Sequence, residues 1–516
     1  MKVTDALDGA LSTLVERPAA ILPAYFVGYG AGTVARTIPL LGLCLAYLLL
    51  LVQGRLAPLE DALAATDPEA LGEAGSQPVD PEAIPTERLE EAFAGLLTPG
   101  VLVVVGVSVL LGLAIWLLVG AAFHAGQIHT VYAALGERSP VEAGVSGAIG
   151  DLKPFVGLAL FEYGLYALVT VVYGLVVFVA SALYAADPGL GLVIAVGAAL
   201  LAPVWLLSVL AIAAVFVFAP QAVVVDRVGT VDGVRRGAGF LRRRPGAFVA
   251  YLLVALGLTA AVGGATALFA VLGVSQVASI LTLVFVTPFL HLLKTGIYAE
   301  GGRVETRPLL SAEGRGLRAR LGQGWAASAG AFRSAVLSTT GLALTGVCLL
   351  VFGLGTLGGY LAVGEFALGM GEVGDPTAVF GPFPVDTFVM IAANNWLVAV
   401  GQTFAGLAFG LPTVVNLLFN GAIVGLVAGL STDLPVVAAL VVPHALLEVP
   451  ALAASGALGL RLGYASWRRA RGTVDDAALA SEIRLAFWAL VGLASVFVVA
   501  SFVEAFLTPR IAGWFL

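Results

Sequence analysis

The residues most able to do chemistry in this sequence are polar side chains that interrupt apolar segments of its C-terminal half. Asn416 and Asn420 are four residues apart, as are His444 and Glu448, so each pair shares one face of a helix. Amide, imidazole and carboxylate groups can hydrogen-bond, carry a proton or bind a cation. The complete candidate set is Asn394, Asn395, Gln402, Asn416, Asn420, His444 and Glu448.

More than one interpretation stays open for these residues. Asn394 and Asn395 suit hydrogen bonds between helices as well as a binding site. His444 and Glu448 suit an internal pair in a helix loosened by two flanking prolines, a proton or cation site, or a metal site. One histidine and one glutamate are too few for a zinc enzyme, and the sequence has no His-Glu-x-x-His motif. We therefore expect no catalytic residue, no metal ligand and no cofactor.

The composition requires a bilayer around most of the chain. Of the 516 residues, 59% are hydrophobic and 11% are charged, against about 25% charged residues in a soluble domain. The mean hydropathy is +1.01. A soluble chain of this length cannot bury so much apolar surface, which excludes a cytosolic enzyme, a secreted disulfide scaffold and a nucleic-acid binder. Cys44 and Cys348 lie inside apolar runs, and we expect both to be small core side chains.

Eleven segments are apolar over roughly the 20 residues that a membrane helix needs, which predicts an all-α, polytopic integral membrane protein with about 11 transmembrane helices. The segments are 20–53, 100–124, 155–184, 190–218, 247–271, 274–298, 336–363, 388–410, 412–431, 436–462 and 485–508. The predicted domains are a six-helix transmembrane domain (1–298), a cytoplasmic basic linker with an interfacial helix (299–335) and a five-helix domain (336–516).

The distribution of charge predicts the topology. Residues 54–99 hold ten acidic residues and two arginines, and residues 364–388 hold four acids and no base. Basic residues gather in three other segments, 221–246, 299–335 and 461–484. Because basic loops stay cytoplasmic, we place these three segments inside and both acidic loops outside. The protein is then expected in the cytoplasmic membrane, with its N-terminus in the cytoplasm and its C-terminus outside.

A short pattern recurs three times in the first half: an amphipathic stretch, a basic residue, a proline and two apolar segments. It predicts short helices over 1–18, 139–154 and 230–245 that end at the basic-proline pair near the inner membrane surface, because proline suits the first turn of the next helix. Amphipathic helices are also predicted at 87–97 and 317–332. The pattern resembles six-helix membrane domains of archaea and bacteria, some of them attached to phosphodiesterases. A duplication that only builds a stable bundle is the alternative.

The energetics of burial predict where the candidate residues lie. An unpaired amide or carboxylate is costly in hydrocarbon, so pairing among the three spans that carry these groups is favoured. We therefore expect Asn394, Asn395, Asn420, His444 and Glu448 to converge. Nearby glycines allow the close helix approach that this requires; they are Gly401, Gly406, Gly410, Gly421 and Gly425.

Ionisable residues within the apolar segments of the first half are few. Glu162 is an acid in the middle of such a segment. His291 and Lys294 lie near the end of another, and we expect their polar ends to reach the head-group level. His124 and His129 are five residues apart and diverge around a helix, so we expect them at the membrane interface rather than as a ligand pair.

Four ordered motifs in the second half resemble the stage II sporulation protein M family. They are Asn394-Asn395, Asn420-Gly421, the run from Pro443 to Ala451, and Gly459-Leu460-Arg461-Leu462-Gly463. The resemblance covers about 320–516, and the family usually has glycine where Ala445 stands. In spore-forming bacteria it implies a membrane component that works with peptidoglycan hydrolases during engulfment. Relatives also occur in organisms that never sporulate, including archaea.

Together these features predict an integral membrane scaffold or anchor of the stage II sporulation protein M type, not an enzyme. The expected partners are membrane lipids and other membrane or envelope proteins, or further copies of the chain, but not nucleic acid. The alternative is a channel or secondary transporter that uses the intramembrane Asn/His/Glu cluster. A membrane-embedded hydrolase ranks third, because it would need a nucleophile or a metal that the sequence does not clearly supply.

Overall fold

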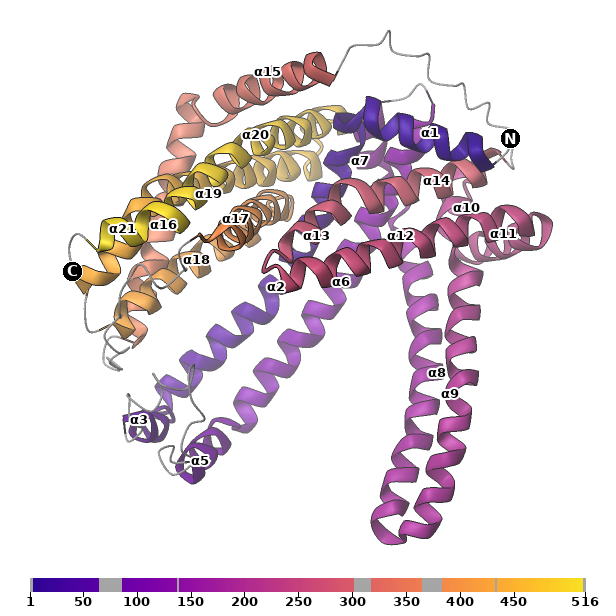
Figure 1. The fold of residues 1–516 in the computed structure, drawn as a ribbon, viewed down its shortest axis with the longest axis horizontal. Helices are drawn as coiled ribbons and strands as arrows, with labels where there is room; N and C mark the ends of the chain where they lie inside the picture. The colour runs from indigo at the N-terminus through magenta and orange to yellow at the C-terminus, as the bar shows by residue number, and fades with distance from the viewer. Residues whose placement is uncertain are drawn as a thin grey trace. The chain divides into compact units, whose positions relative to one another are not determined.

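The computed structural model describes residues 3–64, 86–136, 139–300, 317–363, 383–431 and 434–513, and these form α-helices with short connections (Figure 1). Within these residues, eleven helical segments are long and apolar enough to cross a membrane. This confirms the predicted all-α polytopic membrane fold. Each observed segment overlaps one predicted segment, because hydropathy averaged over about 20 residues is a robust signal.

The spanning helices are numbered in chain order. They are α2 (Pro18–Val52), α6 (Pro99–Ala134), α8 (Leu152–Ala186), α9 (Pro188–Phe216) continued by α10 (Ala219–Asp226), α12 (Pro245–Val271), α13 (Gln276–Leu281) continued by the π-helix η2 (Thr282–Val286) and α14 (Thr287–Glu300), α16 (Thr339–Val363), α17 (Val385–Ala405), α18 (Leu411–Leu430), α19 (Leu434–Ala470), and α20 (Asp476–Phe502) continued by the π-helix η5 (Val503–Leu507) and α21 (Thr508–Ala512).

Short helices occur where the repeated pattern predicts them. They are α1 (Val3–Glu16), α7 (Pro140–Gly150) and α11 (Thr230–Arg243). Pro18 begins α2 and Pro245 begins α12, as predicted. The second copy differs, because α7 ends at Gly150 and Pro154 is the third residue of α8. A proline is tolerated there, since the N–H groups of a first helical turn have no partner within the helix.

Further short helices confirm the amphipathic predictions. They are α5 (Thr86–Leu96) and α15 (Leu317–Ala335), and α3 (Ala57–Ala64) follows α2 directly. Residues 65–85 of the predicted external loop 54–99 lie outside the described residues, and so do residues 301–316 of the linker 299–335. The position of these helices relative to a membrane surface stays a prediction.

By its internal contacts the chain divides into two compact units. Unit 1 comprises Met1–Ala24, Gly120–Ala260 and Phe285–Ala312, and unit 2 comprises Tyr25–Val119, Ala261–Val284 and Glu313–Leu516. The helices α2, α6 and α12 each contribute residues to both units. The predicted division at 298 and 336 follows the sequence pattern and stays a prediction.

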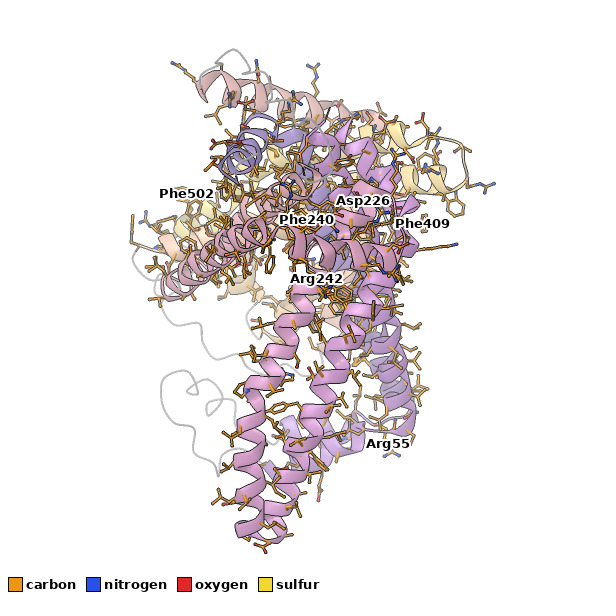
Figure 2. All side chains as sticks on the ribbon, turned by 90° about the vertical axis from the view of Figure 1, so that its right-hand side faces the viewer. Arg55, Asp226, Phe240, Arg242, Phe409 and Phe502 are labelled. Carbon is orange, nitrogen blue, oxygen red and sulfur yellow. The ribbon has the colours of Figure 1, made fainter. Side chains whose placement is uncertain are left out.

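In unit 1, α8 and α9 pair along their length as a hairpin (Figure 1). A cluster of buried alanine, aliphatic and phenylalanine side chains from α6, α8, α9 and α10 forms a core, and it includes Ala125, Ile128 and Phe155. Polar and aromatic contacts hold α10, α11 and α14 together. The Tyr298 hydroxyl donates to Asp226 at 2.9 Å, and the Phe240 ring packs on the rings of Phe218 and Tyr298 (Asp226 and Phe240 are labelled in Figure 2).

In unit 2, α16 and α18 approach closely through glycines. A Cβ atom at Gly355 would collide with the backbone of Leu418, and one at Gly421 would collide with the backbone of Phe352. Such small-residue contacts are a common way for membrane helices to associate. The remaining packing joins α17, α19 and α20, with α15 against α20.

The two cysteines differ in their surroundings. Cys348 is fully buried in a cluster with Leu417 and Ala453, as predicted. The prediction for Cys44 is wrong, because this residue of α2 is exposed. An apolar run in a membrane protein does not imply burial in the protein core, since lipid can cover the outer face of a helix.

Candidate functional site

The seven candidate residues belong to three groups of contacts within unit 2. Asn394 and Asn416 line a cavity. Gln402 is part of a buried network of uncharged groups, which we call the neutral network. His444 and Glu448 gather with Glu504 in what we call the His–Glu–Glu cluster.

The cavity has a volume of about 330 Å³ and is lined by residues of α2, α13, α17 and α18. The charged residue in its lining is Arg36, whose Nε donates to the carbonyl of Gly32 at 3.1 Å. Asn416 connects the lining to Asn420, because the Asn420 amide donates to the Asn416 side-chain oxygen at 3.0 Å. Asn394 donates to its neighbour Asn395 at 3.3 Å. Most of the residues lining the cavity have side chains that can form hydrogen bonds; they are Tyr29, Thr33, Arg36, Thr37, Gln276, Asn394 and Asn416.

The neutral network joins three helices. The Gln402 amide of α17 donates to the carbonyl of Leu452 at 2.7 Å and also to the hydroxyl of Ser455, both on α19. Thr403 donates to the carbonyl of Ser455 at 2.7 Å, and Thr413 of α18 donates to the carbonyl of Gln402 at 2.6 Å. Gln402, Thr403, Thr413 and Ser455 are fully buried. These bonds fix α17, α18 and α19 against one another without charge.

The His–Glu–Glu cluster joins α19 to η5. His444 and Glu448 are one turn apart on α19, and Glu504 comes from the π-helix. One donor atom from each of the three side chains lies within 4.8 Å of the other two, and all three residues are partly buried. An imidazole nitrogen with two carboxylates is a set that can hold a proton or a cation.

The structure thus brings Asn394 and Asn416 to one cavity, bonds Asn416 to Asn420, and places His444 beside Glu448. A single site that unites the asparagines with His444 and Glu448 stays a prediction. Ser455 and Glu504 were not predicted. Glu504 could have been found by the criterion that identified Glu162, because each is an acid within an apolar segment. Ser455 could not, because serine is common in helices and does not by itself indicate a site.

Arg461, in the last of the four motifs, connects α19 to α20. Its Nε lies 2.5 Å from Oε2 of Glu482, and its Nη2 donates to Oε1 at 3.0 Å. This paired geometry makes the contact directional as well as electrostatic. On the following turns, Arg469 also forms an ion pair with Asp476, the first residue of α20. The motif arginine therefore has a structural partner within unit 2.

A second ionisable group, which we call the Glu–Lys group, lies in unit 1. Glu162 accepts a hydrogen bond from Tyr166 at 3.2 Å and is close enough to Lys294 for an electrostatic interaction. The His124 and His291 rings stack with centroids 5.7 Å apart. The expectation that Lys294 extends to the head-group level is wrong, because its side chain is buried and only 9% exposed.

The histidine pair in the sequence also separates in the structure. Nε2 of His129 lies 2.7 Å from the carboxylate of Asp151, the residue between α7 and α8. His124 instead stacks on His291 and contacts Phe155 edge to face. The prediction that His124 and His129 do not act as a ligand pair agrees with these different partners.

Comparison with known proteins places the motifs in a family context. Residues 348–509 match the family model of stage II sporulation protein M. The resemblance predicted from the four motifs is confirmed for this region, which contains the neutral network, the His–Glu–Glu cluster and Arg461. A relative, an uncharacterized protein of the archaeon Methanocaldococcus jannaschii, is 25% identical over 177 residues, which is 33% of this chain and 95% of the relative. No solved structure matches the chain.

Proposed function

We propose that the protein is a scaffold in the cytoplasmic membrane, with its N-terminus inside, that anchors other membrane or envelope proteins and performs no catalysis. Two features support this role. The C-terminal region matches a membrane-protein family, and the α8–α9 hairpin of unit 1 has far fewer buried residues than α17 and α20 of unit 2.

The difference in burial carries the proposal. Within their most apolar 18-residue windows, 50% of α17 and 44% of the α20 segment is buried, but only 6% of α8 and 6% of the α9 segment. The hairpin of α8 and α9 therefore offers nearly its whole surface to lipid or to partner helices, while unit 2 supplies a packed body. Open apolar surface of this extent on a paired hairpin suits association with other membrane helices.

This arrangement does not favour the alternative of a channel or secondary transporter. The most deeply buried of the candidate polar residues, Gln402, donates to Leu452 and Ser455, and it belongs to a network that fixes three helices together. A transport cycle would have to break these bonds, each with a net value of about 1 kcal/mol. A fixed network suits a rigid anchor better.

Photocrosslinking in native membranes tests the scaffold role. A small photoreactive residue replaces Leu168 of α8 or Leu200 of α9, which are 60% and 72% exposed. We expect both positions to yield an adduct with the same membrane or envelope protein. Depletion of the full chain should then release that partner from its normal membrane location.

Leu350 of α16 is the matched control, because it is an apolar residue of a spanning helix that is 64% exposed. It should yield lipid adducts only. Equal yields of the protein adduct from all three positions would indicate random collision in the membrane. Lipid adducts alone from Leu168 and Leu200, with no protein displaced by depletion, would contradict the scaffold role.

A further inference from the structure

We propose that His444, Glu448 and Glu504 bind a divalent transition-metal ion that ties η5, the π-helix after α20, to the middle of α19. The inference is independent of the scaffold role, because its test measures metal rather than partner binding. It begins from the gathering of three metal-ligating side chains from two helices, with donor atoms within 4.8 Å of one another.

The charge of the cluster favours a divalent ion. Two carboxylates in a low-dielectric region carry a large desolvation cost unless a positive charge balances them. None of the ion pairs formed by the described residues includes Glu448 or Glu504. One divalent cation with two carboxylates and a neutral imidazole gives a group with no net charge, which is the arrangement that costs least in an apolar environment.

The donor atoms favour a first-row transition metal. Imidazole nitrogen suits zinc and related ions, whereas magnesium and calcium prefer oxygen ligands alone. Nδ1 of His444 is fully buried and has no hydrogen-bond partner among the described residues. A buried imidazole nitrogen without a partner loses hydration and gains nothing in return. A metal ion bound to the imidazole ring would explain why this histidine lies beside two carboxylates.

The geometry needs only a small closure. Zinc bonds to nitrogen and oxygen are about 2.0–2.2 Å long, so donors in a tetrahedral site are ~3.4 Å apart. The separations in the cluster, up to 4.8 Å, exceed this by at most ~1.4 Å. Rotation about the flexible side-chain bonds of Glu448 and Glu504 is enough to supply that movement. Three protein ligands leave one position for water.

Both helices depart from regular geometry at the level of the cluster. Pro443 and Pro450 lie on either side of His444 and Glu448 in α19, and each removes one backbone hydrogen bond. Glu504 lies within η5, where the π-helical turn widens the backbone. Such irregular backbone at membrane depth is tolerated where it is buried in protein or lines a polar site, and π-turns are frequent at functional sites. Two independent irregularities therefore meet at the same three side chains.

The test measures metal in the full chain, purified in detergent through an affinity tag without histidine. The protein is loaded with Zn²⁺ or Mn²⁺, and free ion is then removed. We expect elemental (inductively coupled plasma) mass spectrometry to find about one metal ion per chain. The absorption-edge spectrum of the zinc-loaded protein should show nitrogen and oxygen ligands with one imidazole. Sulfur ligands would assign the metal to a cysteine and overturn the proposal, as would a protein that retains no zinc or manganese.

Variants then assign the ligands. We expect each of three variants to bind metal more weakly: Glu448→Gln, Glu504→Gln and His444→Ala. The loss of affinity, measured by competition with a chromophoric chelator, should be about 10–100-fold or more, because changing residues that only orient the metal ligands already costs that much. Ser501→Ala is the matched control, because Ser501 is a buried residue of α20 one turn before Glu504, and it should bind like the parent. Equal binding by the parent and both glutamine variants would overturn the proposal. The spectrum of the parent protein decides the question even where a variant does not fold.

Discussion

The Glu–Lys group of unit 1 and the His–Glu–Glu cluster of unit 2 both lie within candidate membrane spans, and they differ in how charge is balanced. In the Glu–Lys group of unit 1, Glu162 has Lys294 as an electrostatic neighbour and Tyr166 as a hydrogen-bond donor. In the His–Glu–Glu cluster of unit 2, Glu448 and Glu504 gather with His444, and no described ion pair includes either acid.

The comparison contrasts a carboxylate that has a cationic neighbour in the chain with two carboxylates that have no described ion-pair partner. A charge in a low-dielectric environment is costly unless an opposite charge or a proton accompanies it. The Glu–Lys group contains its own base, so its stability is a property of the chain. The His–Glu–Glu cluster contains two acids and an imidazole but no lysine or arginine, so its stability depends on what it binds, and a bound cation adds to the free energy of unfolding.

The largest expected effect comes from removing the base of the Glu–Lys group. Lys294→Met keeps the length of the side chain and leaves Glu162 without its cationic neighbour. Breaking a buried ion pair on one side costs about 3–5 kcal/mol, and we expect about 2–3 kcal/mol here, because Glu162 is only partly buried and interacts with Lys294 at longer range than an ion pair. The free energy of unfolding in mixed detergent, measured by denaturant titration, tests this value.

The double variant Glu162→Gln with Lys294→Met is the control for that experiment. It removes both charges, so it should recover most of the lost free energy of unfolding. A double variant as unstable as Lys294→Met alone would show that lysine packing, rather than charge, holds the group together.

The fold was largely predictable because its signals are sums over many residues. Eleven apolar segments, the short helix α11 and the proline at the start of α12 follow from hydropathy and from the chemistry of proline. The extent of α2 (Pro18–Val52) also agrees with the predicted segment 20–53, but the extent of α6 was not predictable. The predicted segment 100–124 ends well before Ala134, the last residue of α6, and this helix contributes to both units, which depends on tertiary packing that hydropathy does not encode.

The candidate site was predictable only where it is local. Residues four apart on a helix share a face, and the Asn416–Asn420 hydrogen bond and the neighbouring positions of His444 and Glu448 follow from that rule. The contribution of Glu504 depends on α19 packing against η5, a contact between distant parts of the chain. The burial of Lys294 likewise depends on neighbours that its own segment does not specify.

A smaller effect is expected where polarity is buried without charge. Gln402→Leu removes the amide that donates to Leu452 and Ser455 while keeping most of the side-chain volume. Loss of one partner from a buried network costs about 1–3 kcal/mol, and we expect about 2 kcal/mol. Because no charge is involved, the loss should be the same in chelator and in zinc. A metal-dependent loss would show that the neutral network and the His–Glu–Glu cluster are coupled.

The smallest effect should have the opposite sign. In protein stripped of metal by a chelator, Glu504→Gln removes one of two acids that lie together without a lysine or arginine, and an amide can still hydrogen-bond. Replacing uncompensated buried charge is often stabilising, so we expect the free energy of unfolding to rise by about 1 kcal/mol, again measured by denaturant titration. Glu162→Gln, which leaves Lys294 without its acid, should lower it under the same conditions. Zinc should raise the stability of the parent and leave Glu504→Gln nearly unchanged, because a ligand stabilises only the folded state that binds it. If Glu504→Gln instead destabilises the chelated protein as much as Glu162→Gln does, then the carboxylate of Glu504 has a compensating partner of its own, and the contrast between the two groups does not hold.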